Sequence, residues 1–231
     1  MNRLRKFVVL YWFLIIAAAV IRGEMLNAAT QQTSSTTAAT IIDRAESIVN
    51  DSDNDLSSSA ELLVWLNDGM IDIVARTHCL EATESIDLAT STLEYSVTST
   101  YVTVKAVLYK DSAGTFWALK KGSPSSVGQN TAADAPMYWY DWGGKIGIYP
   151  TITRTTETIT VYYVTRPTAI ASSANVTTPA LYDTALTYYT AAHAFLKDRQ
   201  TGRYAQLMGL YLQELARIRG DLTEQPVGVI E

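Results

Sequence analysis

The sequence has very few of the residues on which most catalytic and metal sites depend. Its 231 residues include one cysteine, Cys79, and two histidines, His78 and His193. A single cysteine excludes an intramolecular disulfide and every zinc site built from several cysteines. A catalytic triad or a histidine metal site needs a histidine held by an acid or a second ligand, and neither histidine has that spacing. We therefore predict structural roles for all three residues, no catalytic residues and no enzymatic activity.

The sequence also lacks a complete motif for a metal ion, a phosphate group or another cofactor. It has no glycine-rich phosphate-binding pattern. Asp51, Asp53 and Asp55 have the spacing that opens a calcium loop, but Leu56 and Leu62 stand where that loop requires glycine and glutamate. We expect these acids to solvate a turn before a helix, and we predict no metal site and no cofactor.

Positive charge is scarce as well. The net charge is −5 and the isoelectric point is about 5.1, which excludes a protein that coats nucleic acid with basic residues. Four lysines lie among strand-like residues: Lys105, Lys110, Lys120 and Lys121. Their spacing is loose, and we interpret them as a solvated sheet edge that discourages unwanted strand pairing.

The first 24 residues differ from the rest. An apolar run at 7–21 follows three basic residues, and it is shorter than the roughly 20 residues that cross a bilayer. The segment fits a signal peptide. It also fits translated sequence that lies upstream of a true start at Met25. A membrane anchor is the third and least favoured interpretation. Without residues 1–24 the net charge is −8.

The apolar spacing predicts an α+β fold in which helices come first and last. Residues 25–39 form a polar lead-in that we expect to be flexible. Apolar residues at helical spacing in 40–80 predict a helical hairpin, and its two helices begin with capping boxes at Thr40 and Ser58. The apolar spacing over residues 178–222 predicts two closing helices, and the composition of residues 223–231 predicts an extended tail.

Between the helices, the spacing of apolar residues changes to alternation. Residues 81–170 contain about six short segments rich in Thr, Val, Ile, Tyr and Trp, separated by turns such as Trp142-Gly143-Gly144. We therefore expect an antiparallel helical bundle of about four helices with an inserted antiparallel β-sandwich or small barrel.

Three groups of residues in this order resemble one known family. The first is Ile41-Ile42-Asp43-Arg44-Ala45 with Glu61-Leu62-Leu63-x-Trp65-Leu66-Asn67-Asp68-Gly69. The second is Ile148-Tyr149-Pro150 with Arg166-Pro167, and the third is Pro179-x-Leu181-Tyr182-Asp183 with Lys197-Asp198. Together, over about residues 40–222, they are similar to the head-to-tail connector, or adaptor, proteins of tailed bacteriophages.

The resemblance implies a virion structural protein assembled in the host cytoplasm. Such adaptors form a ring of about twelve copies below the portal, extend the DNA channel and dock tail or neck proteins. DNA would pass without sequence-specific contact, and the mature protein would need no membrane. The resemblance also assigns portal docking to the tail residues Val227, Val229 and Ile230.

Two alternatives remain open from the sequence. One is an exported β-rich binding module with a signal peptide, whose ligand face carries Trp139, Tyr140 and Trp142. The other is a hydrolase with an unrecognised site.

Overall fold

A computed structural model describes residues 33–50, 56–126, 135–153 and 156–223. Within these ranges it contains four α-helices and two four-stranded sheets, so the α+β class predicted from the sequence is confirmed. The chain divides into a helical unit, residues 1–66 with 170–231, and a β unit, residues 67–169. The expected acidic turn at Asp51, Asp53 and Asp55 lies outside the described residues.

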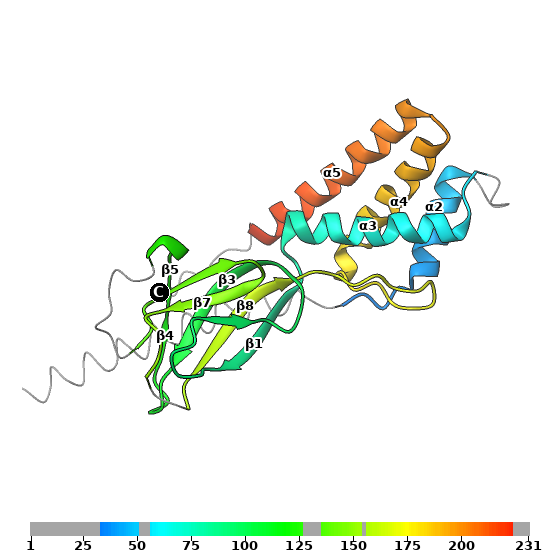
Figure 1. The fold of residues 1–231 in the computed structure, drawn as a ribbon. Helices are drawn as coiled ribbons and strands as arrows, with labels where there is room; N and C mark the ends of the chain where they lie inside the picture. The colour runs from blue at the N-terminus through cyan, green and yellow to red at the C-terminus, as the bar shows by residue number, and fades with distance from the viewer. Residues whose placement is uncertain (1–32, 51–55, 127–134, 154–155, 224–231) are drawn as a thin grey trace, which may run out of the picture. The chain divides into compact units, whose positions relative to one another are not determined.

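The helical unit contains α2 (Ala38–Val49), the first part of α3 (Ser59–Thr77), α4 (Asp183–Lys197) and α5 (Thr201–Thr223). A 3-10 turn, η2 (Ala180–Tyr182), leads into α4. Helix α4 packs against both α2 and α5, and Figure 1 shows α4 and α5 side by side. Arg199, at a left-handed φ of 58°, reverses the chain between them. The buried side chains of this unit include Ile41, Leu62, Leu66, Leu186, Phe195, Tyr211 and Ile218.

Residues 33–37, part of the predicted lead-in, pair with the segment that precedes α4. Isolated antiparallel bridges join Thr33 to Pro179 and Thr37 to Asn175. The side chain of Thr37 then accepts a hydrogen bond from the Thr40 amide at 3.3 Å. The N-cap of α2 is therefore Thr37, and the capping box expected at Thr40 is wrong. The bridge at Thr37 fixes the chain there, so the helix begins earlier than the side-chain spacing suggested.

A buried carboxylate holds the same segment from the other side. Asp183, at the first position of α4, accepts hydrogen bonds from the Ser34 hydroxyl at 3.0 Å and the Thr36 hydroxyl at 2.7 Å. Ser34 and Asp183 are only 3% and 8% exposed. Both bonds reach Oδ2 of Asp183 and give the buried Ser34 hydroxyl the acceptor that it requires, whereas Oδ1 has no hydrogen-bond partner among the described residues.

The β unit has two sheets. The first sheet has the order β1-β8-β3-β4 and the second has β2-β7-β6-β5. The strands are β1 (Glu81–Asp87), β2 (Glu94–Ser96), β3 (Tyr101–Lys110), β4 (Phe116–Ala118), β5 (Lys120–Lys121), β6 (Tyr138–Trp142), β7 (Lys145–Tyr149) and β8 (Thr158–Thr165). A short 3-10 turn, η1 (Pro124–Ser126), follows β5. Six of these strands correspond to the six segments predicted from alternation, and β1 and β5 are additional.

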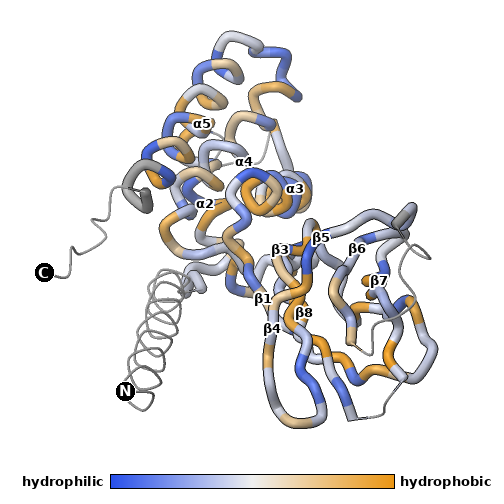
Figure 2. Tube along the Cα trace, turned by 90° about the vertical axis from the view of Figure 1, so that its left-hand side faces the viewer, coloured by the Kyte–Doolittle hydropathy of each residue, from blue (hydrophilic) through white to orange (hydrophobic). Residues whose placement is uncertain are grey.

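The two sheets share one core, as expected for a sandwich. It combines side chains of the first sheet with side chains of the second: Val104, Val107, Tyr109, Ile159, Val161 and Tyr163 with Tyr95, Trp139, Ile146 and Ile148. Figure 2 shows hydrophobic segments along β3, β7 and β8. Every strand pair is antiparallel except β5 with β6. The chain leaves β4 in the first sheet and enters β5 in the second within residues 116–121.

The hairpin between β6 and β7 turns on two glycines. Gly143 and Gly144 have φ angles of 60° and 76°, which residues with a Cβ rarely adopt. The following Gly147 is required for a different reason. Tyr140, opposite it in β6, lies across its backbone so closely that an added Cβ would come within 2.0 Å of the Tyr140 ring.

Candidate interaction surfaces

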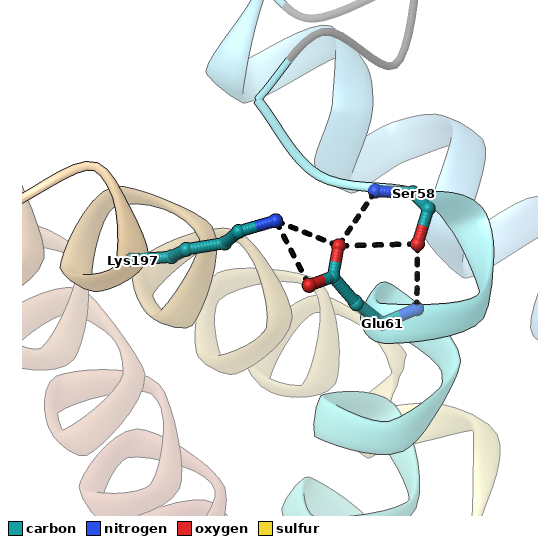
Figure 3. Close-up of polar contacts among 3 residues, drawn as sticks. All are labelled: Ser58, Glu61 and Lys197. Carbon is teal, nitrogen blue, oxygen red and sulfur yellow. Dashed lines mark hydrogen bonds and ion pairs between the residues drawn. The ribbon is translucent and has the colours of Figure 1, made fainter.

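Helix α3 is tied to α4 by one exposed carboxylate. Glu61 accepts hydrogen bonds from the Ser58 amide at 3.0 Å and the Ser58 hydroxyl at 3.1 Å, and its own amide donates to the Ser58 hydroxyl at 3.3 Å. This is the capping box predicted at Ser58. Lys197 at the end of α4 bonds both carboxylate oxygens, at 2.8 and 2.7 Å (Figure 3). The Lys197 and Ser58 bonds lower the pKa of Glu61 to about 2, so this link stays charged at neutral pH.

A shallow groove lies between α2 and α4. Its lining residues are Thr40, Asp43, Arg44, Ser47, Ile48, Thr184, Thr187 and Tyr188. Asp43 and Arg44 are exposed, and the Ile48 side chain is 39% exposed. The mixed charge and the open shape suit contact with another protein surface rather than enclosure of a small molecule.

A polar pocket occurs at one end of the β unit. It is lined by Val97, Thr98, Ser99, Thr100, Tyr101, Asp141, Gly144 and Arg166. The Tyr101 hydroxyl donates to the Asp141 carboxylate at 2.8 Å. Burial, and then the neighbouring Asp141, raises the pKa of Tyr101 far above its usual value. Tyr101 therefore remains a hydrogen-bond donor at neutral pH and cannot serve as a base.

The two histidines occupy structural positions. His193 contacts the backbone carbonyl of Tyr189 at 2.9 Å, and its ring lies 4.3 Å from that of Tyr189 and 6.3 Å from that of Trp65. His78 follows the last residue of α3 at a φ of 56°, and its amide donates to the Val74 carbonyl at 2.9 Å, as in a left-handed helix cap. Neither arrangement pairs a histidine with an acid.

Cys79 is 9% exposed, and burial raises the pKa of its thiol. A buried thiol with a raised pKa is a poor nucleophile. Over the described ranges, no three residues among His, Cys, Asp and Glu are grouped so that they could hold a metal ion. In the same residues, no helix is long and apolar enough to cross a membrane.

The aromatic ligand face of the exported-module alternative is not present. Trp139 is 2% exposed and belongs to the sandwich core, and Tyr140 is 4% exposed because it lies across Gly147. Only Trp142 is exposed, at 66%, beside the hairpin turn. Alternation along β6 places Trp139 on the opposite face from Tyr140 and Trp142, so the three side chains cannot contact one ligand together.

The lysines are divided between the middle and the edge of the sheets. Lys105 lies on β3, inside the first sheet, and forms an ion pair with Glu81 of β1. Lys120 and Lys121 form β5, at the edge of the second sheet, as the sequence suggested for the whole group. Lys110, at the end of β3, lies over the exposed ring of Phe116 in β4.

Sequence reasoning missed β1, the other edge of the first sheet. Its seven residues, EATESID, include three acids, and acidic residues are uncommon in strands. The available signal was the alternation of Ala82, Glu84 and Ile86, which point inward along the strand and are half-buried.

The predicted portal-docking residues Val227, Val229 and Ile230 lie outside the described residues.

A protein-family model described as SU10 adaptor protein matches residues 36–229 of the chain. No curated protein matches the sequence of the chain. The family match begins just before α2, spans the whole β unit and includes α4 and α5.

Proposed function

Because the chain belongs to the SU10 adaptor protein family, a family of phage head-to-tail adaptors, we propose that it forms a ring of about twelve copies below the portal. The ring extends the DNA channel and docks tail or neck proteins. The resemblance drawn from residues 40–222 is thereby confirmed at the level of the family, and the protein is a structural component of the virion. Copy number, position and channel belong to the proposal.

One observation carries the proposal: a single family match covers both the helical and the β unit. The surfaces are consistent with this role. The groove between α2 and α4 is open and of mixed charge, and large apolar side chains such as Phe116 and Trp142 are 57% and 66% exposed. Exposed apolar groups of this kind commonly mark contacts between proteins.

The charge of the chain supports passage of DNA. A protein that binds DNA tightly neutralises many phosphates with lysine and arginine. Here the net charge is −5 over the whole sequence, so DNA would move past the ring without a strong attraction. Assembly in the host cytoplasm requires no contact with a membrane.

The C-terminal tail is proposed to dock on the portal through Val227, Val229 and Ile230. Alternate apolar side chains on an extended segment can fill pockets on another protein while the backbone adds to a strand edge. Each tail contributes little affinity alone, and a ring presents many tails at once, so the total affinity is multiplied.

Reconstitution with the portal of the same phage tests the function. We would mix the purified chain with purified portal rings, isolate the complex by size and count copies by mass and electron microscopy. A closed ring of about twelve copies on the tail-facing side of the portal is expected. A chain that stays monomeric and does not bind the portal contradicts the proposal.

A further inference from the structure

The turn between β3 and β4 is flanked by an exposed aromatic ring and two charges. Phe116 begins β4 opposite Lys110, the last residue of β3, and is 57% exposed. The Lys110 ammonium lies 5.4 Å from the centre of the Phe116 ring. Asp111 follows Lys110, and its carboxylate accepts a hydrogen bond from the Thr115 amide at 2.7 Å. Among the described residues, neither Lys110 nor Asp111 has an ion-pair partner. We call Phe116, Lys110 and Asp111 the hairpin knob.

The polar pocket lies at the other end of the same strand. Tyr101, one of its lining residues, is the first residue of β3, and the ten residues of that strand span roughly 30 Å. Arg166, which directly follows β8, and Asp141 of β6 also line the pocket. Among the described residues, neither of these two charges has an ion-pair partner, and they are not paired with each other. The pocket therefore offers both a cation and a carboxylate to an incoming group.

The charges of the pocket are the opposites of those on the hairpin knob. The Tyr101 hydroxyl bonds Oδ1 of Asp141, and Oδ2 has no bond from the described residues, so an ammonium such as that of Lys110 can pair there. The Arg166 guanidinium can likewise pair with the carboxylate of Asp111. Charges of opposite sign that meet in this way select one partner surface and one register.

The pocket can also hold the aromatic ring of the knob. Its volume is about 490 Å³, and Val97 and Tyr101, which pack against the sandwich core, give it an apolar part. The planar guanidinium of Arg166 can cover the face of the Phe116 ring that Lys110 leaves open. A copy cannot fill its own pocket, because its knob is a full strand length away. The matching knob must therefore come from a second copy.

We propose that the hairpin knob of one copy docks in the polar pocket of the next, with Lys110 against Asp141 and Asp111 against Arg166. The contact joins two different surfaces of the same chain, and repeated contacts of this kind close into rings. The inference rests on the proposed ring and specifies which side chains hold neighbouring copies together. Each contact involves few residues, and the closed ring supplies the avidity.

The first test removes the aromatic ring. Phe116→Ser deletes the ring of the knob, and Val64→Ser on α3 is the matched control, because Val64 is also 57% exposed. Ring formation would be measured by mass, with the chain alone and with the portal, and thermal unfolding checks that both variants fold. We expect Phe116→Ser to raise the concentration for half assembly by at least about tenfold and Val64→Ser to leave it unchanged.

The second test exchanges charge across the contact. Lys110→Glu and Asp141→Lys should each assemble at least about tenfold more weakly, because like charges then meet. The Lys110→Glu/Asp141→Lys double variant should assemble again, because the new glutamate of one copy meets the new lysine of the next. Asp141→Asn is the conservative control: it keeps an acceptor for the Tyr101 hydroxyl and removes only the charge, so its loss should be smaller than that of Asp141→Lys.

The outcomes separate this inference from the proposed function. If the wild-type chain does not assemble with or without the portal, the proposed function fails. If the wild type forms rings and all variants form them equally well, or if the double variant is not restored, the contact between knob and pocket is wrong while the adaptor function stands. Loss of portal binding by Phe116→Ser with unchanged rings also overturns the inference, since the knob would then bind another protein.

Discussion

Lys197 bonds both carboxylate oxygens of Glu61, a residue 136 positions earlier in the chain, at 2.8 and 2.7 Å. The pair joins the start of α3 to the end of α4. Glu61 also closes its own helix through Ser58 (Figure 3). One side chain therefore serves both as a helix cap and as the link between two helices.

We predict that Glu61→Gln lowers stability at neutral pH and loses this effect in acid. The pKa of Glu61 falls from 4.5 to about 2 in the folded chain. A group whose pKa is lowered by folding stabilises the fold above its unfolded pKa, and this contribution is lost as the pH falls through the folded value. The difference between wild type and variant in the urea midpoint should therefore be full above pH 4.5 and shrink toward pH 2.

A Lys197→Gln variant provides the matched control. It should show the same pH dependence, and the Glu61→Gln/Lys197→Gln double variant should lose little more than either single one. A midpoint difference that stays constant across this pH range would show that the link carries no charge-dependent stability.

We predict that Gly147→Ala destabilises the β unit by about 1–3 kcal/mol, because overpacking forces neighbouring groups to move. The added Cβ would meet the ring of Tyr140 at 2.0 Å. Gly209→Ala is the control, since Gly209 lies within α5 with no atom near an added Cβ. That change should stabilise the helix by about 0.5–1 kcal/mol. Thermal unfolding measures the stability of both variants. A Gly147→Ala variant as stable as Gly209→Ala would contradict the close contact between Gly147 and Tyr140.

We predict that Asp183→Ala releases residues 33–37 from the helical unit. Ser34 and Thr36 donate to this carboxylate, and the Ser34 hydroxyl would remain buried without its acceptor. Such a loss costs about 1–3 kcal/mol. Amide hydrogen exchange at residues 34–38 should become faster. Asp183→Asn, which keeps an acceptor oxygen, should have a smaller effect, and unchanged exchange in Asp183→Ala would refute the link.

We predict that deletion of residues 225–231 weakens portal docking by at least about tenfold, since avidity multiplies the loss of each tail. Unfolding of the truncated chain should match that of the full chain. Replacing Val227, Val229 and Ile230 with serine tests the apolar side chains without shortening the chain. Docking that is equal in all three proteins would show that other residues bind the portal.

The sequence predicted features that depend on near neighbours. The capping box of Ser58 and Glu61 requires a three-residue spacing, and the strands at 101–110 and 158–165 follow from alternating apolar residues. The strand at 81–87 was missed because three acids interrupt its pattern. It forms nonetheless, since Ala82 and Ile86 pack against the core and the backbone pairs with β8.

Features that depend on distant partners could not be read in advance. Nothing near Trp139 and Trp142 in the sequence distinguishes the core residue from the exposed one, because only the sheet face decides it. The same holds for the interaction surfaces. The acidic β1 becomes an edge of the first sheet, and Lys120 and Lys121 come to the edge of the second sheet, only after the strands of both sheets have been ordered in space.

The division of the chain also sets the order in which its parts become available during synthesis. The β unit is continuous in sequence, whereas α2 must wait for α4, and the Ser34–Asp183 bond spans 149 residues. At roughly 5–20 residues per second, that interval lasts about 7–30 s. The β unit can therefore begin to fold on the ribosome while the first helix still lacks its partner, and its strands can pair before the helical unit is complete.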